Sequence, residues 1–451
     1  MKFIFVLTVS FLLFEGFVIK CHKVDPAQPE LSNDLMEEIL SVAGLDATIM
    51  ARRANISAAD NVMSRIFENH IIVINLHGTI SGIEQHLQNG ELHLHIGNFN
   101  RLMSLFEKFG KNVRRIHINY KSLIGPYDRE RQIINKNIIK RFGDQLTELK
   151  ITTFYDAIWN EISNENGEIH FPNVKKFSYT GINGRDIFDL HSIFPKLETF
   201  RMNGLVRIID KNCLANVKNL KELELKISSI GIEEHQLDSI FANNKGISTL
   251  VLSIVRRKDT LRSIEENLKH LETLEIQGHA DNEILERGFD RVYNLKSVIT
   301  FRLNFYVTSQ LVDKILSFEM PNLKRLYLQA LLIDNRITDF INHFKNLEMA
   351  DVRSETKNVM VKQIGKLIYA KAFVTIDSDV LEISLLEIFE TFDRKHSSVK
   401  TWKVFGVEEA KYIICSDQMN AINGQLKDSN KPTWTLSYDR NEKYLVFKRD
   451  L

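Results

Sequence analysis

The chain of 451 residues has few cysteines, few prolines and almost no net charge. Its three cysteines, Cys21, Cys213 and Cys415, form no Cys-x-x-Cys pair, which argues against a zinc ribbon or a thiol-redox site. Seven prolines exclude proline-rich linkers. A formal net charge of +1 provides no field that would favour nucleic acid or an anionic membrane. We therefore expect a fold that rests on its apolar core, and no nucleic-acid partner.

Long apolar runs are also scarce, with one exception at the N-terminus. Met1-Lys2 is followed by the apolar run Phe3–Phe14, which Glu15 ends. This pattern is typical of a secretory signal peptide, and the run is shorter than the roughly 20 residues of a membrane-spanning helix. We predict a signal peptide over residues 1–21, a secreted (extracellular) mature chain and no membrane span in it. An uncleaved signal anchor and a buried N-terminal segment are the alternatives.

Two short motifs bear on the secretory interpretation. Asn55-Ile56-Ser57 is an N-glycosylation sequon, which makes Asn55 the candidate glycosylation site. The terminal Lys448-Arg449-Asp450-Leu451 loosely matches the Lys-Asp-Glu-Leu retention signal but has no glutamate before the leucine. The endoplasmic reticulum lumen is therefore an alternative location.

An internal repeat runs through most of the chain. Its pattern is an apolar residue, two polar residues, an apolar residue, one polar residue and another apolar residue. Clear copies are Leu220–Leu225, Leu271–Ile276 and Leu323–Leu328. Weaker copies start at Val113, Leu146, Val174, Leu197, Ile247, Leu295, Leu347 and Val399, with a degenerate copy near Phe373–Ile376. The alternating end of each copy predicts a half-buried strand.

Helical patterns lie between these strands. Leu237, Ile240 and Phe241 share one helical face, as do Phe340, Ile341 and Phe344. Strands that alternate with helices predict an α/β fold with a parallel sheet covered by helices.

The strand pattern and its spacing resemble the leucine-rich repeat family, whose repeats have about 20–29 residues. The resemblance implies a solenoid with the parallel β-sheet on the concave face and helices on the convex face. We expect about 12 irregular repeats over residues 69–405. The family usually has an asparagine or cysteine after the strand, where this chain has Ser228, Val255, His279 and Leu331.

The ends of such a solenoid need caps, because a bare terminal repeat exposes its core. Residues 406–451 are the predicted C-terminal cap, in which Trp434–Tyr438 and Tyr444–Phe447 flank a polar turn and predict a β-hairpin. Residues 30–68 are the predicted helical N-terminal cap. In that segment Leu35, Ile39 and Val42 fit one helical face.

The segment 30–68 also resembles an F-box. Residues that match the opening F-box pattern are Leu31, Asp34, Leu35, Met36 and Ile39, whereas Ser32 replaces the usual proline. Proteins that combine an F-box with leucine-rich repeats are substrate receptors of cullin-RING ubiquitin ligases. The resemblance implies that Leu35, Met36 and Ile39 contact the ligase adaptor subunit. Ubiquitin ligation takes place in the cytoplasm or nucleus, so this alternative conflicts with the predicted signal peptide.

The chain contains no motif typical of a catalytic site, such as His-Glu-x-x-His, Gly-x-Ser-x-Gly or a phosphate-binding Gly-Lys-Ser/Thr loop. We therefore expect no enzymatic activity and no cofactor.

Four histidines could share one face of the predicted sheet. His93 and His95 alternate with Leu92, Leu94 and Ile96, and His117 and His77 could face the same way on strands about 4.8 Å apart. Imidazole binds zinc or copper and titrates near neutral pH. A metal or pH-sensing site at His77, His93, His95 and His117 is therefore a further alternative to simple exposed positions, and a one-residue slip in register would remove it.

The outward positions of the repeat strands form the predicted ligand surface. The candidate ligand-binding residues are Arg115, His117, Lys150, Lys176, Arg201, Glu222, Glu224, Glu275, Arg325 and Tyr327. Charges of both signs interleave, which suits a polar protein epitope or simply a soluble surface. The sequence thus predicts a secreted, non-enzymatic leucine-rich repeat protein that binds a protein or another macromolecular ligand through its concave sheet.

Overall fold

The structure of the chain is a computed structural model that forms two units. The first comprises residues up to Phe188 with Ser192–Lys196, and the second comprises Asp189–His191 and Leu197–Leu451. The residues that the structure describes are 33–53, 55–76, 83–96, 99–120, 132, 134–153, 170–181, 189–204, 214, 216–227, 234–253, 258–278, 292–307, 312, 318–330, 335–354, 367, 369–375, 385–394, 398–405, 409–429, 431–440 and 443–450. The predicted signal peptide and His77 lie outside these residues.

Three helices open the first unit, namely α2 (Asn33–Ala43), α3 (Leu45–Arg53) and α4 (Ser57–Asn69). The inward face of α2 is not the predicted one, since Leu35 is 44% exposed while Glu37 and Leu40 are buried. Helix α4 holds the buried carboxylate of Glu37, because the Asn61 amide donates to Oε1 at 2.5 Å and Arg65 forms an ion pair with Oε2. A buried charge is tolerated when it is paired and hydrogen-bonded, so α2 turns Glu37 inward and Leu35 outward.

The sheet of the first unit begins with a hairpin. Strands β2 (Ile83–Gln88) and β3 (Glu91–Ile96) are antiparallel and join through Asn89 and Gly90, which both have positive φ. An Asn-Gly pair favours this tight turn because both residues tolerate the left-handed region. The remaining strands are β1 (Ile71–Leu76), β4 (Arg115–Asn119), β5 (Glu148–Thr153) and β6 (Lys176–Gly181).

Strand β1 lies between β3 and β4 and pairs in parallel with both. Strand β4 then pairs in parallel with β5, and β5 with β6. The helical segments that connect these strands are α5 (Phe99–Phe109), η1 (Gly110–Asn112), η2 (Asn135–Ile139), α7 (Lys140–Phe142) and η3 (Gly143–Gln145). The short α9 (Leu190–Ile193) follows β6, and its residues are divided between the two units. Because β1 lies between β3 and β4, the order of the strands in this sheet differs from their order along the chain.

In the second unit, parallel strands follow one another in chain order. They are β7 (Thr199–Gly204), β8 (Glu222–Ile227), β9 (Thr249–Leu252), β10 (Thr273–Gln277), β12 (Thr300–Val307), β14 (Arg325–Ala330), β15 (Met349–Ser354), β16 (Ala372–Thr375) and β17 (Thr401–Phe405). Each strand pairs in parallel with the next. The α/β fold with a large parallel sheet that the alternating pattern predicts is therefore confirmed.

A turn of constant geometry precedes the strands and keeps them in register. The first apolar residue of a copy donates its N–H to the carbonyl three residues earlier, as Ile247 does to Asn244 at 3.1 Å. The backbone carbonyl of the second residue of a copy accepts N–H groups from two consecutive residues of the next copy, as Lys221 does from Ser248 and Thr249 at 2.8 and 3.2 Å. Because this turn recurs, the variable spacing between copies falls in the connections.

Asparagines placed before the strand reinforce these turns. The side-chain amides of Asn173, Asn322 and Asn346 donate to carbonyls of the preceding turn at 2.7, 2.8 and 2.6 Å. The asparagine expected after the strand is thus replaced at these repeats by one immediately before the first apolar residue. Such bonds satisfy turn carbonyls that would otherwise lack a partner.

One repeat copy starts three residues later than the sequence pattern suggests. In the observed register Leu274 of β10 lies opposite Phe301 of β12, so this copy starts at Val298 and not at Leu295. Leu295 instead follows the short strand β11 (Tyr293–Asn294), which pairs in parallel with β13 (Phe318–Glu319). Both Leu295 and Val298 are buried, which explains why the apolar pattern alone did not distinguish them.

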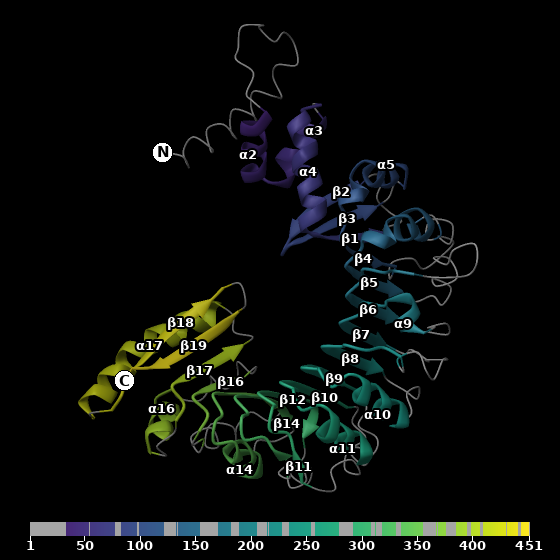
Figure 1. Ribbon diagram of the computed structural model, residues 1–451. Coiled ribbons are helices and arrows are strands. Elements are labelled where there is room, and N and C mark those ends of the chain that lie inside the picture. Colours follow the sequence, from purple (N-terminus) through teal and green to yellow (C-terminus); the bar gives the residue numbers. More distant parts are fainter. Residues whose placement is uncertain are drawn as a thin grey trace, which may run out of the picture. The chain divides into compact units, whose positions relative to one another are not determined.

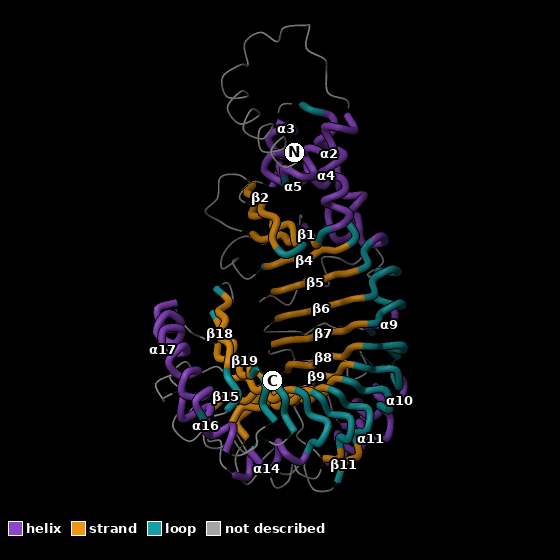
Figure 2. Tube along the Cα trace, turned by 90° about the vertical axis from the view of Figure 1, so that its left-hand side faces the viewer, coloured by secondary structure: helices purple, strands orange, loops and turns teal. Residues whose placement is uncertain are grey.

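The helices of the second unit lie along one side of its sheet (Figures 1 and 2). They are α10 (Glu234–Asn243), α11 (Lys258–Asn267), α14 (Asn335–His343) and α16 (Leu385–Arg394). The predicted faces Leu237–Ile240–Phe241 and Phe340–Ile341–Phe344 are buried. The core therefore lies between helices and strands, and the polar strand positions occupy the other face of the sheet.

The second unit ends with a long helix, α17 (Glu409–Asp428), and a hairpin of β18 (Trp434–Asp439) and β19 (Tyr444–Arg449). The hairpin lies where the sequence predicts it, and β19 continues the sheet as an antiparallel neighbour of β17. Helix α17 was not predicted from the sequence. Trp434 stacks on Phe389 with ring centroids 4.6 Å apart, which anchors the hairpin on α16. None of the helices in the described part of the chain has the length and hydropathy needed to cross a membrane.

Candidate functional site

The predicted ligand-binding residues of the second unit do lie on one face of the sheet, but they divide into two groups. The first group lies on β7 and β8 and contains Arg201, Glu222, Glu224 and Lys226. Arg201 pairs with Glu222 at 2.9 Å and reaches Glu224 at 3.8 Å, and Lys226 pairs with Glu224 at 2.9 Å. We call these residues the β7–β8 group. Their charges neutralise one another across neighbouring strands.

The second group follows further along the same face. Strand register places Glu275, Arg302, Tyr327 and Asp351 in one row across β10, β12, β14 and β15. The next row contains Asn304, Gln329 and Arg353, of which Gln329 and Arg353 are register partners. We call Arg302, Asn304, Tyr327, Gln329, Asp351 and Arg353 the β12–β15 group. Together with Glu275 and the backbone near Leu303 and Leu328, they line a cavity of about 100 Å³.

Aromatic and amide contacts hold the β12–β15 group in place. The Arg302 guanidinium lies over the Tyr327 ring, 4.0 Å from its centroid, which is a close cation–π contact. The Gln329 amide donates to Asn304 Oδ1 at 2.9 Å, and the Gln277 amide donates to Glu275 Oε1 at 2.6 Å. These contacts restrict the side chains before any ligand arrives.

The Asp351 carboxyl group differs from the rest of the group in its hydrogen bonding and its pKa. Its Oδ1 atom is buried and has no hydrogen-bond partner among the residues that the structure describes. Burial raises the pKa of this carboxyl above the ordinary 3.8, while the charges of Arg353 and Arg302 act in the opposite direction. Within the described part of the chain, neither arginine forms an ion pair with it. A donor from a ligand would therefore find an acceptor that the protein leaves open.

A β-bulge shapes the same region. The pairing of β12 with β14 shifts between Leu303 and Tyr306, so β12 has extra residues opposite a continuous β14. Bulges occur frequently beside binding sites because they re-aim side chains. Here the bulge leaves Asn304 exposed and Phe305 buried, 4% exposed.

In this region Glu275, Arg325 and Tyr327 were predicted from the sequence, whereas Arg302, Asp351 and Arg353 were not. Arg325 is exposed at the start of β14. The misplaced start at Leu295 hid Arg302, because the pattern that begins at Val298 makes Arg302 an outward position. Asp351 and Arg353 follow a weak copy in which Ala350 takes the place of a large apolar residue. Counting outward from Val298 and Leu347 would have found all three.

In the first unit, strand register places Arg115, His117, Lys150 and Lys176 on one face of β4, β5 and β6, as predicted. Arg115 donates to the backbone carbonyl of Asn69. His117 lies 3.4 Å from the Thr152 hydroxyl. Arg115 thus ties this face to the end of α4, and His117 contacts the neighbouring strand β5.

The histidines do not lie on adjacent strands as the sequence suggests. Val73 of β1 is the register partner of both His93 and His117, so β1 separates them by two strand spacings, or about 10 Å. His93 contacts Glu91 at 3.1 Å and Asn75 at 3.5 Å, and its ring stacks on His95 with centroids 6.4 Å apart. Within the described residues, no group of three or more histidine, cysteine, aspartate or glutamate side chains could hold a metal ion. His77 lies outside them.

Other candidate residues lie in the N-terminal helices. Asn55 is exposed between α3 and α4 and has a φ of 61°. Leu35 is exposed, while Met36 and Ile39 are half-buried, so these residues are within reach of a partner. Met50 on α3 is 56% exposed.

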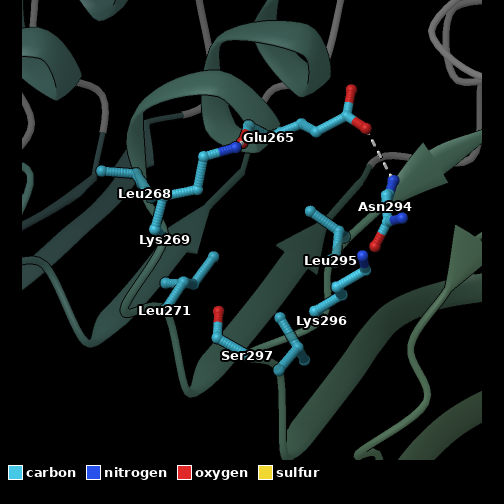
Figure 3. A pocket seen from close by; sticks show the side chains of 9 residues that line it. Glu265, Leu268, Lys269, Leu271, Asn294, Leu295, Lys296 and Ser297 are labelled. Carbon is cyan, nitrogen blue, oxygen red and sulfur yellow. Dashed lines mark hydrogen bonds between the residues drawn. The ribbon is translucent and has the colours of Figure 1, made fainter.

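A separate pocket of about 230 Å³ lies between α11 and the turn before β12 (Figure 3). The Glu265 carboxylate accepts the backbone N–H of Asn294 at 2.8 Å, and Lys269 donates to the Glu265 carbonyl at 2.5 Å. The Glu265–Asn294 bond joins α11 to β11, so we assign this pocket a structural role.

Comparisons of the chain with protein-family models and with curated proteins gave no match.

Proposed function

We propose that this protein is a leucine-rich repeat solenoid that binds a protein ligand through the β12–β15 group. The observation that carries the proposal is the buried Oδ1 of Asp351, which has no hydrogen-bond partner among the described residues and lies beside the exposed side chains of Arg302 and Arg353. The repeated turn and the parallel pairing of successive strands support the leucine-rich repeat assignment. The helical N-terminal segment and the C-terminal hairpin would serve as its caps.

The composition of the group favours a protein ligand. Arginine and tyrosine are enriched at the energetic centres of protein interfaces, where a few side chains supply most of the binding free energy. Tyr327 and Arg302 are already stacked, so less side-chain entropy is lost when a ligand binds. A ligand with one hydrogen-bond donor for Asp351 and carboxylates for the arginines would match the group chemically.

The experiment that tests this proposal is site-specific photo-crosslinking. The full chain is secreted from a eukaryotic host with a photoreactive residue in place of Gln329, next to the cavity, and is mixed with extracellular protein. A matched control carries the photoreactive residue in place of Glu266, which is exposed on the helical side. We expect a discrete adduct from position 329 only, lost when Arg302 and Arg353 are both replaced by alanine. Equal labelling from both positions would refute a site on this face.

We also propose that the chain is secreted after removal of residues 1–21. N-terminal sequencing of protein from the medium checks this directly. A start near residues 17–24 supports secretion, whereas an intact Met1 on cytosolic protein contradicts it.

A second candidate function is supported by the exposed Leu35 and the half-buried Met36 and Ile39. Under this alternative the N-terminal helices are an F-box that binds the adaptor of a cullin-RING ligase. A pull-down with purified adaptor tests it, with Leu35→Asp as the disrupting variant and Ser41→Asp, exposed on the same helix, as the control. Retention by both the wild-type chain and Leu35→Asp, or by neither, counts against this alternative.

A further inference from the structure

A basic pocket lies at the C-terminal end of the second unit, apart from the β12–β15 group. Its lining contains four cationic side chains, Lys400, Lys427, Lys431 and Arg449, and one carboxylate, Asp450. Ser398, Pro432 and Thr433 complete it, and its volume is about 570 Å³. In a chain of net charge +1, this concentration of positive charge is local.

Four separate segments bring these side chains together. Lys427 lies in the last turn of α17, and Lys431 follows on the loop that leads to β18. Backbone hydrogen bonds fix the other walls, because Arg449 N–H donates to the Lys400 carbonyl at 2.9 Å and Asp450 N–H donates to the Thr433 carbonyl at 2.8 Å. The positive charges therefore converge because of the tertiary fold.

The negative groups nearby neutralise only part of this charge. The Asp450 carboxylate accepts a hydrogen bond from the Thr433 hydroxyl at 2.7 Å, and Glu390 of α16 pairs with Lys431 at 3.0 Å. Lys400 and Lys427 have no ion-pair partner among the residues that the structure describes, and both are exposed. Lysine charges that lie close together repel one another, and an anion bound between them would offset this repulsion.

The hydroxyl groups of the lining are already engaged. The Ser398 hydroxyl donates to the Ala370 carbonyl at 2.8 Å, and Thr433 is bonded to Asp450. Pro432 and the aliphatic parts of the lysines supply the remaining apolar wall. The pocket thus offers ammonium donors to a compact anion and leaves room for the apolar or sugar-like body that carries it.

We propose that this pocket binds a tetrahedral oxyanion, a phosphate or sulfate group borne by a larger molecule. Lysine ammonium groups donate strong charge-assisted hydrogen bonds to such oxygens. The anion would bridge Lys400 and Lys427, which join the start of β17 to the end of α17. This site is independent of the ligand surface proposed above, and its failure would leave that proposal standing.

The test is isothermal titration of the full chain with inorganic phosphate and, separately, inorganic sulfate at constant ionic strength. We expect saturable binding of one or both anions, with the tighter anion identifying the group. Titrations at pH 6 and pH 8 separate the two, because phosphate gains negative charge over this range and sulfate does not. The absence of saturable binding by either anion would overturn the proposal.

A pair of charge-matched variants localises the binding. Lys400→Gln with Lys427→Gln should weaken the affinity at least tenfold. Lys245→Gln with Lys345→Gln removes two exposed lysines from repeat turns and should leave it unchanged. Equal weakening by both pairs would show that only net charge matters, and would also refute the pocket. Circular dichroism melting of each variant confirms that it is folded.

Discussion

The β7–β8 group and the β12–β15 group occupy equivalent outward positions on different strands of the same sheet, yet their polar side chains are arranged very differently. In the first, Arg201 and Lys226 use both neighbouring glutamates, so each charge has its counter-charge within the protein. In the second, Oδ1 of Asp351 has no hydrogen-bond partner within the described part of the chain, although Arg302 and Arg353 are close enough to influence its pKa. The identity of the outward polar residues alone does not show which group has its charges paired and which does not.

The difference shows what distinguishes a solvated surface from a binding surface. An exposed ion pair has a small net effect on stability and little reason to exchange its partner for a ligand. A buried acceptor without a donor carries a free-energy cost that a ligand can remove. We therefore assign ligand binding to the β12–β15 group and a solvated role to the β7–β8 group.

The largest effects on stability are expected from substitutions of core residues beneath the two groups. These effects should be of equal size in both groups. Phe200 and Phe301 are both fully buried, at register positions that face the helices. Replacing either by alanine should lower the free energy of unfolding by roughly 3–5 kcal/mol, measured by urea denaturation. The adjacent Arg201→Ala and Arg302→Ala should each cost less than about 1 kcal/mol. A small loss for Phe301→Ala alone would mean that the register of β12 is wrong.

The register of β12 is the part of the second unit's sheet that the sequence pattern predicted incorrectly. The pattern located most strands, because an apolar residue three positions before the inward strand residue recurs from Val113 to Val399. It failed at Leu295, since an additional buried leucine in the turn imitates the start of a copy. Periodicity detects buried residues, and it cannot tell a buried turn residue from a buried strand residue.

The candidate site was only partly predictable for a related reason. Glu275 and Tyr327 follow clear copies, so their outward direction could be read from the alternation. The placement of β1 between β3 and β4, which separates His93 from His117, depends on a pairing between distant segments. The lack of a partner for Asp351 likewise depends on side-chain positions on three strands. Neither property has a local signal in the sequence.

The second-largest effect is expected in ligand binding, which substitutions in the β12–β15 group should weaken more than substitutions in the β7–β8 group. Arg302→Ala with Arg353→Ala should reduce crosslinking from position 329 at least tenfold, equivalent to about 1.4 kcal/mol. Arg201→Ala with Lys226→Ala removes the same charge and should change the yield less than about twofold. The measurement is the adduct yield over a range of chain concentrations. The opposite ranking would move the site to β7 and β8.

The pH dependence of stability offers a smaller test that needs no ligand. Because burial raises the pKa of Asp351 above 3.8, the folded chain holds this proton at pH values where the unfolded chain has released it. The contribution of Asp351 to the free energy of unfolding therefore falls as the pH rises above 3.8 and through the folded-state pKa. Asp351→Asn should remove this dependence and make the chain more stable at neutral pH.

Urea denaturation at several pH values measures this effect. Asp339→Asn, at an exposed position of α14, is the matched control and should leave the slope of stability against pH unchanged. A neutral-pH loss of stability in Asp351→Asn would mean that the ionised carboxylate has favourable contacts, and would remove the argument that it awaits a donor.

The smallest effect is expected in the β7–β8 group. Glu224 contacts Arg201 at 3.8 Å and Lys226 at 2.9 Å, and its side chain is 21% exposed. A double-mutant cycle of Glu224→Gln and Lys226→Gln should give a coupling energy of about 0–1 kcal/mol, because solvent and entropy offset most of the attraction between exposed charges. The coupling should shrink further at high salt. A coupling well above this range, unchanged by salt, would mean that the ion pairs are effectively desolvated. The β7–β8 group would then stabilise the sheet itself, and full pairing of its charges would reflect folding and not merely the absence of a ligand.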